Sequence, residues 1–333
     1  MVAILTAVAA FVLGVALTHL FIRMADRQGV LAHANERSMH RGATVTGGGL
    51  PLLVAALAAF FIFWPTQNIH GLILPAAALL ALVSFFDDLK PVAQWVRFGA
   101  HIVAAAAAIS VVQSDQMIFQ DWLPYWLDRG LALFLVVWFI NLFNFMDGID
   151  GIAGIETIFI MAGFLIVSTV AGAETPLDGL AFAFAGATAG FLFWNWHPAR
   201  VFMGDVGSIP LGFLCAAMLI WLAVNVSLAA ALILPLYFVA DATITILTRL
   251  SRGEKIWQAH RSHFYQRSAR GVSSHAIVVR RVAACNGVLI ALAVLALSMP
   301  ATAFCLAVLS VAILLVWMQV AADANVAIEA GAS

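Results

Sequence analysis

Apolar runs long enough to cross a lipid bilayer recur along the whole chain, and they constrain its fold more than any other feature of the sequence. A helix of roughly 18 or more apolar residues spans about 30 Å of hydrocarbon. Hydrophobic residues make up 64% of the 333 residues and charged residues only 10%, which is far more apolar than a soluble domain needs to be. The runs lack the alternation of membrane-barrel strands. The sequence therefore predicts an all-α, polytopic integral membrane protein.

We expect about eleven transmembrane helices in one membrane domain that covers residues 1–333. The first run lacks a basic start and an obvious small-residue cleavage site, which favours a retained helix over a signal peptide. The cysteines fall inside predicted spans, so neither a disulfide framework nor a metal knuckle is indicated. The predicted spans are 1–22, 47–65, 71–86, 98–113, 130–143, 153–172, 178–194, 208–224, 227–248, 281–298 and 301–320.

The basic residues predict the orientation of the chain. Apart from Arg129, every Lys and Arg falls in alternate connections between the predicted spans, including Arg37 and Arg41 before the second span. By the positive-inside rule these connections are cytoplasmic. An odd number of spans then places the N-terminus in the periplasm and the C-terminus in the cytoplasm, as expected for a bacterial inner-membrane protein.

Four polar segments that are far apart in the sequence are expected to meet on the cytoplasmic face. They are Asp87-Asp88 after the third span, "NLFNFMDGIDG" after the fifth, "NWHPARVFMGDVGS" after the seventh, and the basic, His-containing stretch 249–281 after the ninth. Polar groups gathered at one membrane face indicate a site rather than scattered surface residues.

Asp87 and Asp88 end a predicted span that runs from outside to inside, so they lie at a helix C-terminus. The helix dipole disfavours negative charge there. The pair could simply be solvated or cap the next helix. Otherwise a bound cation, or basic groups such as Lys90 and Arg97, must stabilise the two carboxylates.

The segment "NFMDGIDG" has two Asp-Gly pairs, and one such pair would be enough for a turn. Asn141, Asn144, Asp147 and Asp150 follow one another at intervals of three residues, which would place their oxygens roughly on one helical face. Such oxygens suit a hard cation such as Mg2+, usually together with water and substrate phosphates. We therefore interpret the segment as holding a metal, or a nucleotide diphosphate through it.

In "FMGDVGS", glycines flank Asp205 and Ser208 can cap a helix that begins after it. The motif could be a cap alone. However, Arg200 lies about one helical turn upstream of Gly204, and free backbone N–H groups at a helix start suit phosphate. Together these features favour a functional role for Asp205.

The loop "HRSHFYQR" places His260 and His263 one turn apart beside Arg261 and Arg267. Zinc is disfavoured because no Cys or acidic residue has the spacing of a zinc site. An array of Arg and His that receives a phosphate is the preferred interpretation, and an anchor on anionic lipid is the alternative.

Two further features are unusual. Gly47, Gly48 and Gly49 could form a hinge or let the backbone approach a ligand closely. Asp241 lies inside the predicted ninth span, where a carboxylate marks a functional or partnered site. Arg249, near the same helical face, is its expected partner within the helix.

Six motifs in this order resemble the polyprenyl-phosphate N-acetylhexosamine-1-phosphate transferases, and the resemblance covers nearly the whole chain. The motifs are "HRGATVTGGG", "FFDDLK", "NLFNFMDGIDGIAG", "VFMGDVGS", "DATITILTR" and "HRSHFYQR". The resemblance implies transfer of a sugar-1-phosphate from a UDP-N-acetylhexosamine to undecaprenyl phosphate, release of UMP, and a requirement for Mg2+ or Mn2+.

The resemblance also implies residue roles. Asp87 and Asp88 match an acidic pair proposed to take the proton of the lipid phosphate, and Asp205 matches the aspartate most directly associated with Mg2+. Asn144, Asp147 and Asp150 match the segment that handles metal and nucleotide. His260 and His263, with Arg261 between them, match a loop implicated in binding the donor.

Three basic residues, Lys90, Arg97 and Arg200, could hold the incoming lipid phosphate, and Asp241 is a further candidate for substrate binding. This chain has His-Arg-Ser-His where the peptidoglycan translocase branch has consecutive histidines, which favours the branch that initiates O-antigen and related glycans. UDP-GlcNAc is the expected donor, with UDP-FucNAc and UDP-QuiNAc as alternatives. The sequence does not decide whether the protein forms a homodimer, and no nucleic-acid partner is expected. A transporter of an anion or metal is the alternative from another class.

Overall fold

The structure is a computed structural model that describes residues 1–28, 44–65, 71–255 and 260–331. Predicted features at Arg37, Arg41 and residues 40–43 of the first motif lie outside these ranges. Thirteen helices make up the described chain, and an isolated parallel bridge between Val45 and Val201 is its only β pairing. The all-α prediction is therefore confirmed. The helices are α1 (Val2–Gln28), α2 (Gly49–Phe63), α3 (Ile73–Leu89), α4 (Gln94–Ser110), α5 (Tyr125–Met146), α6 (Ile152–Val170), α7 (Asp178–Asn195), α8 (Asp205–Asn225), α9 (Leu228–Ile233), α10 (Leu236–Ser251), α11 (Phe264–Gly271), α12 (His275–Leu295) and α13 (Pro300–Gly331).

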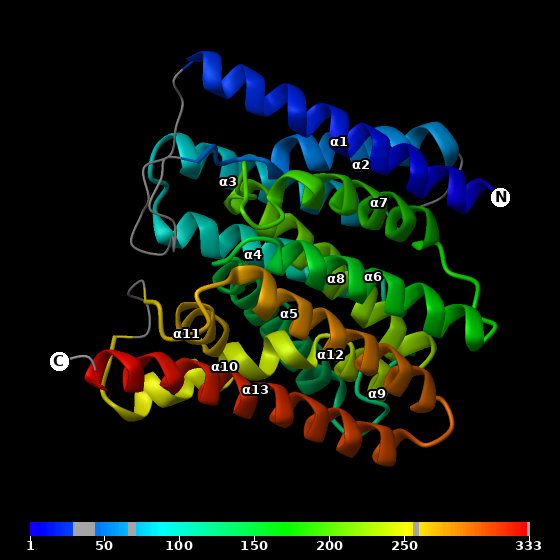
Figure 1. Cartoon of the computed structure of the whole chain (residues 1–333). Helices are drawn as coiled ribbons and strands as arrows, with labels where there is room; N and C mark the ends of the chain where they lie inside the picture. The colour runs from blue at the N-terminus through cyan, green and yellow to red at the C-terminus, as the bar shows by residue number, and fades with distance from the viewer. Residues whose placement is uncertain (29–43, 66–70, 256–259, 332–333) are drawn as a thin grey trace.

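Six of the described helices, α1, α5, α6, α8, α12 and α13, are long and apolar enough to cross a membrane. The helix α2 is equally apolar but shorter. The long helices run roughly along one direction, and the N- and C-termini lie at opposite ends of the bundle (Figure 1). These features confirm a polytopic helical membrane protein, while the count of eleven spans and the orientation stay predictions.

The predicted span 227–248 is not one continuous helix, because the structure divides it into α9 and α10 at Leu234 and Pro235. Proline has no backbone N–H and interrupts helical hydrogen bonding. Ser227 starts the first piece by accepting a hydrogen bond from the N–H of Ala230. The short helix α11, which lies beside α13 (Figure 1), was not predicted.

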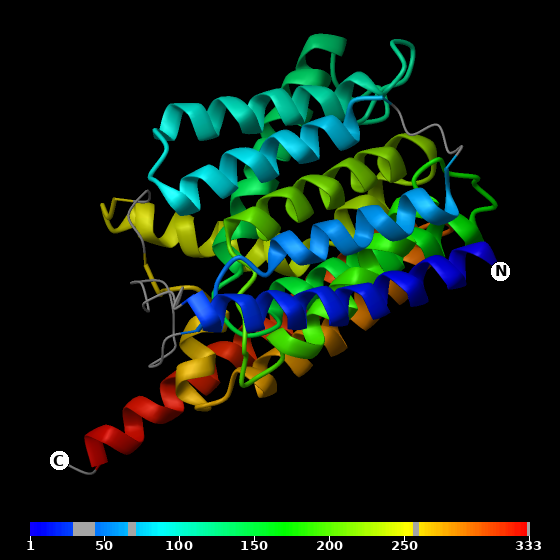
Figure 2. The same cartoon turned by 90° about the horizontal axis from the view of Figure 1, so that it is seen from above.

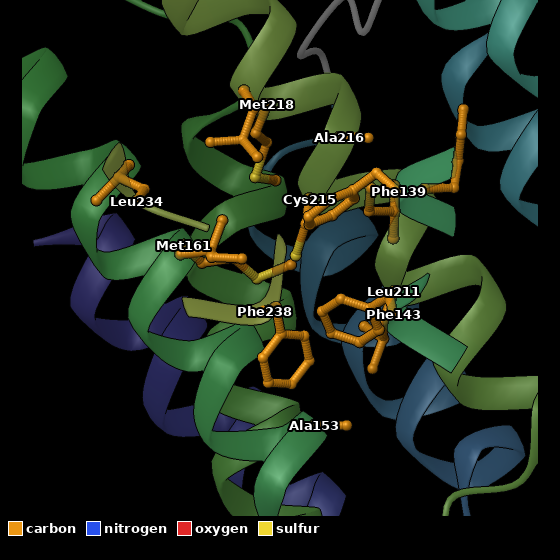
Figure 3. Packing of buried hydrophobic residues seen from close by; sticks show 14 of the residues in the cluster. Phe139, Phe143, Ala153, Met161, Leu211, Cys215, Ala216, Met218, Leu234 and Phe238 are labelled. Carbon is orange, nitrogen blue, oxygen red and sulfur yellow. The ribbon is translucent and has the colours of Figure 1, made fainter. Parts of the chain in front are cut away.

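The helix α8 is the central element of the bundle. Every residue from Val206 to Ala223 is buried, and α8 packs against α3, α5 and α6. Figure 2 shows α3 and α4 side by side along one edge of the bundle. Cys215, near the middle of α8, lies in a buried cluster with side chains of three other helices (Figure 3). They are Phe143 of α5, Met161 of α6 and Phe238 of α10. Inside a bilayer such contacts stabilise the fold mainly through close van der Waals packing.

The glycines at the start of α2 bring two backbones together. Gly48 and Gly49 donate N–H hydrogen bonds to the carbonyls of Phe202 and Met203, at 2.9 and 2.8 Å. A Cβ at Gly49 would collide with the backbone of Gly207. The close approach expected from these glycines therefore joins two parts of this chain, and it fixes the start of α8 beside the start of α2.

Candidate active site

The acidic pair at the end of α3 divides between two different environments. Asp87 pairs with Arg97 of α4 (Oδ2 to Nη1, 2.6 Å) and accepts a hydrogen bond from the N–H of Val92 (2.7 Å). Asp88 instead accepts a hydrogen bond from the N–H of Val206, in the first turn of α8. The expectation that Arg97 stabilises the pair is confirmed for Asp87. Lys90 follows directly after α3 and is exposed.

The predicted helical face of four oxygens is wrong because α5 ends at Met146. Asp147 follows as the C-cap residue, and Asp150 lies in the turn before α6. Asn141 points its amide at His101 of α4 (3.1 Å) and at the carbonyl of Val137. The helical spacing therefore does not extend to the aspartates.

Asn144 joins α5 to α8 because its Oδ1 accepts a hydrogen bond from the hydroxyl of Ser208 (2.8 Å). The prediction that Ser208 caps a following helix is wrong: α8 begins at Asp205, its N-cap residue is Gly204, and Ser208 lies inside the helix. Gly204 has φ of +73°, a conformation that favours glycine. This turn places Asp205 in the first turn of α8, beside the end of α5.

Asp205, at the start of α8, has two carboxylate neighbours, Asp88 at the end of α3 and Asp147 just after α5. Burial and the charges of Asp205 and Asp150 raise the pKa of Asp147 to about 7. Asp88 lies beyond the apolar segment 71–86, and partial burial, Asp205 and Asp87 raise its pKa to about 6. Asp205 thus acts electrostatically on both Asp88 and Asp147. The structure brings together the carboxylates that the sequence placed on one face.

The mutual repulsion of Asp205 and Asp147 would be relieved by a divalent cation bound between them. Carboxylates that repel one another are stabilised when a cation lies between them, and oxygen ligands of this kind suit Mg2+ or Mn2+. Asp205 and Asp147 are the residues that would hold it. Asn144 is hydrogen-bonded to Ser208, three residues after Asp205, and its amide oxygen is a further candidate ligand.

Asp150 belongs to a neighbouring group that sequence reasoning missed. Its Oδ2 lies 2.7 Å from Nδ1 of His197 and 3.3 Å from Nδ1 of His275, and it accepts the N–H of Ala199 at 3.2 Å. Ligand atoms of the three side chains lie within 4.8 Å of one another and could hold a metal ion. His197 lies inside the motif "NWHPAR", which was the available signal, whereas nothing in the sequence linked His275 to Asp150.

Asp241 is fully buried and has partners, but Arg249 is not one of them. It accepts hydrogen bonds from the backbone N–H groups of Phe264 and Tyr265, both at 3.1 Å. Arg249 pairs with Glu254 instead, at 2.7 Å. The predicted Asp241–Arg249 pair is therefore wrong, because the first turn of α11 approaches Asp241 and offers it unsatisfied N–H groups. Its other partners are Tyr237, Thr245 and His263.

The loop with the two histidines is thereby attached to the carboxylate cluster. The rings of His260 and His263 stack with centroids 4.8 Å apart, and His263 is buried. Tyr265 donates its hydroxyl to the carbonyl of Phe145, two residues before Asp147 (3.0 Å). Arg261 is exposed, and its carbonyl accepts a hydrogen bond from Arg270.

Arg200 lies on another side of the site. Its guanidinium stands over the ring of Trp194 at 5.5 Å, and its side chain is exposed. Arg200 lines a pocket together with His19, Arg23 and Asp26 of α1.

The chain is similar in sequence to known proteins. Glycosyl transferase family 4 matches residues 70–223, which include Asp88, Asp147 and Asp205. A phospho-N-acetylmuramoyl-pentapeptide-transferase of Streptococcus pneumoniae is 30% identical over 267 residues, covering 74% of this chain and 80% of that protein. One of Heliobacterium modesticaldum is 29% identical over 263 residues, covering 73% and 81%. A probable undecaprenyl-phosphate N-acetylglucosaminyl 1-phosphate transferase of Bacillus subtilis is 26% identical over 285 residues, covering 79% and 76%.

The fold and the carboxylate cluster define a polytopic membrane protein with a charged site at the helix ends. The similarities then make the assignment specific: the chain belongs to glycosyl transferase family 4, the family of polyprenyl-phosphate N-acetylhexosamine-1-phosphate transferases.

Proposed function

We propose that this protein transfers GlcNAc-1-phosphate from UDP-GlcNAc to undecaprenyl phosphate, releases UMP, and so initiates a lipid-linked glycan. The position of Asp205, near both Asp88 and Asp147, is the observation that carries this proposal. Phosphoryl transfer between two anions is mainly a problem of charge and alignment, and this cluster supplies the groups that can address both.

The positions of these residues support the following proposed roles. Asp205 and Asp147 would hold a divalent cation, which would supply positive charge to offset the donor diphosphate. Asp88 is held at the first turn of α8 and faces the same cluster, so it positions the acceptor phosphate or takes a proton from it. Because the second pKa of a phosphate monoester lies near 6, a strong base is not required, and positioning is the preferred role.

In the reaction, an oxygen of the lipid phosphate attacks the β-phosphorus of the UDP-sugar. The new phosphorus–oxygen bond forms as the bond from the β-phosphorus to the bridging oxygen breaks, and that oxygen leaves with UMP. Asp87 and Arg97 hold the end of α3 to α4, whereas His260, His263 and Arg261 face the donor. Lys90 is the cationic contact proposed for the acceptor phosphate at the cluster, whereas Arg200 lines a separate pocket against α1.

The donor is proposed from two features. The chain has His-Arg-Ser-His in the loop before α11, and the Bacillus subtilis relative is named for N-acetylglucosaminyl 1-phosphate transfer. The alternatives UDP-FucNAc and UDP-QuiNAc keep the same site and change only the sugar. The proposed setting is a bacterial inner membrane with the carboxylate cluster at the cytoplasmic face, in O-antigen or related lipopolysaccharide biosynthesis.

The test uses the purified full-length protein with undecaprenyl phosphate, Mg2+ and one UDP-N-acetylhexosamine at a time, followed by mass spectrometry of the lipid. The expected product is undecaprenyl diphosphate GlcNAc, with one UMP released for each lipid formed. A product from UDP-FucNAc or UDP-QuiNAc alone would replace the proposed donor. Solute uptake into proteoliposomes without any lipid-linked sugar would contradict the transferase proposal and favour a transporter.

A further inference from the structure

A second polar pocket lies between α1 and the segment that joins α7 to α8. Its volume is about 450 Å³, and its polar lining consists of His19, Arg23, Asp26, Thr44, Trp194 and Arg200. None of the three clustered carboxylates lines this pocket. The proposed transfer reaction therefore leaves most of its side chains without a role.

The wall of the pocket is a fixed aromatic ring. The indole N–H of Trp194 donates to the carbonyl of Val15 in α1 (3.0 Å). His19 stacks on the ring with centroids 4.9 Å apart and planes 19° apart. The guanidinium of Arg200 lies over the same ring, and its backbone N–H bonds to the Trp194 carbonyl (2.9 Å). This arrangement places Arg200 at the pocket before any ligand arrives.

The charge of the pocket is predominantly positive. Arg23 and Arg200 both line it, and within the described ranges neither guanidinium lies within ion-pairing distance of a carboxylate. Asp26 is the one carboxylate in the lining. Two guanidinium groups that face a shared space are well suited to a phosphate, because Arg offers paired N–H donors in a fixed geometry.

The pocket opens where the apolar part of α1 ends. Val12, Leu20 and Met24 lie on one stripe of α1 at multiples of four residues, and each is more than half exposed. In a bilayer this stripe would contact acyl chains, and Arg23, just after Ile22, would reach the level of the head groups. The pocket and the stripe thus match the two ends of a lipid molecule.

We propose that this pocket binds the phosphate group of an anionic membrane lipid, through Arg23 and Arg200 against the Trp194 ring, with the lipid chain along the exposed stripe of α1. The phosphate belongs either to a bulk phospholipid or to undecaprenyl phosphate, and both present the same chemistry to the two guanidinium groups. Binding requires no donor nucleotide, so it is measurable whether or not the proposed transfer reaction is correct.

The experiment measures lipid binding to the full-length protein in detergent micelles by native mass spectrometry. Phosphatidylglycerol is the anionic probe, and phosphatidylcholine with the same chains is the zwitterionic comparison. The expected dissociation constant for phosphatidylglycerol rises about tenfold in Arg23→Gln, as for loss of one charge-assisted contact. It falls in Asp26→Asn, because a repulsive charge is removed. Arg280→Gln, which removes an exposed arginine from α12, is the matched control and is expected to bind as the wild type does.

The dissociation constant is expected to rise in Arg23→Gln and to fall in Asp26→Asn, so either variant tests the proposal if the other folds poorly. Competition then identifies the source of the phosphate: displacement of phosphatidylglycerol by undecaprenyl phosphate assigns the pocket to the acceptor, and persistence assigns it to a bulk phospholipid. Displacement by inorganic phosphate at equal concentration would overturn the role of the lipid chain. Unchanged phosphatidylglycerol binding in both Arg23→Gln and Asp26→Asn would overturn the site itself.

Discussion

The carboxylate of Asp88, at the C-terminal end of α3, accepts a hydrogen bond from the backbone N–H of Val206, in the first turn of α8. A carboxylate is disfavoured at a helix C-terminus and favoured at a helix N-terminus. The start of α8 therefore offsets the unfavourable position of Asp88 on α3. It also holds Asp88 beside Asp205, one residue before Val206.

The first prediction concerns the proposed cation ligands. Asp147→Asn and Asp205→Asn each remove one negative charge from the cluster while keeping its shape, so turnover is expected to fall by about 10²-fold or more. UMP release by the purified variants measures it. Asp121→Asn, at an exposed residue with φ of +61° that Asn also tolerates, is the control and should retain activity. Near-normal turnover in either cluster variant would count strongly against this site.

Asp87 and Asp88 are expected to contribute differently to kcat, because they have different partners. Asp88→Asn changes a group that faces Asp205, and we expect a loss of kcat far larger than that of Asp87→Asn. Asp87→Asn and Arg97→Gln break the same 2.6 Å pair, so the double variant is expected to lose no more than about the larger single loss. A double-mutant cycle on kcat measures this, and simple additivity of the two losses would contradict a shared structural role.

The stability of the metal-free protein should depend on pH with a defined sign. The pKa values of Asp88 and Asp147, about 6 and about 7, lie above the ordinary value of 3.8. The folded state therefore binds these protons more tightly than the unfolded chain does. Stability from these groups is greatest below about pH 4 and falls as the pH rises through about 7, as adjacent carboxylates ionise.

Thermal unfolding in detergent with a chelator present tests this dependence. The Tm should fall between about pH 5 and pH 8, and adding Mg2+ should restore most of the loss at the higher pH. Asp147→Asn should flatten the profile because it removes the carboxyl group with the larger shift. A Tm that rises over this range, with no response to Mg2+, would show that the three carboxylates do not repel one another as described.

The partners of Asp150 are expected to position it. His197→Ala removes the side chain whose Nδ1 lies 2.7 Å from the Asp150 carboxylate, and we expect kcat/KM to fall about tenfold, as for loss of one hydrogen bond to a charged group. His197→Asn places an amide N–H close to the position of Nδ1 and should recover most of the activity. Equal losses in both variants would indicate that the ring itself, rather than its hydrogen bond, is needed.

The contact between the starts of α2 and α8 should tolerate no side chain. Gly49→Ala would drive a methyl group into the backbone of Gly207, so the start of α8 must shift, and stability should fall by about 1–3 kcal/mol or more. Gly130→Ala, in α5 with nothing within 4 Å of the new methyl, is the matched control and should be neutral or slightly stabilising. Thermal unfolding of the two variants in the same detergent compares them.

Much of the fold was predictable because the information is local. Long apolar runs specify membrane helices without reference to distant residues, whereas the observed helix ends differ from the predicted bounds, as at α5 and α12. Pro235 is the instructive exception, since the apolar run continues past it while the backbone cannot. The site was predictable as a collection of polar helix ends, because the charged residues directly follow or begin apolar segments.

The amino-acid sequence by itself determined that this chain is a helical membrane protein and that its carboxylates lie at helix ends, because hydropathy and charge position depend on neighbouring residues. Only the tertiary structure decided that Asp88 turns to α8 while Asp87 turns to Arg97, and that Asp150 meets His275, 125 residues away. Pairings over such separations depend on how helices pack, and the same local pattern is compatible with many packings.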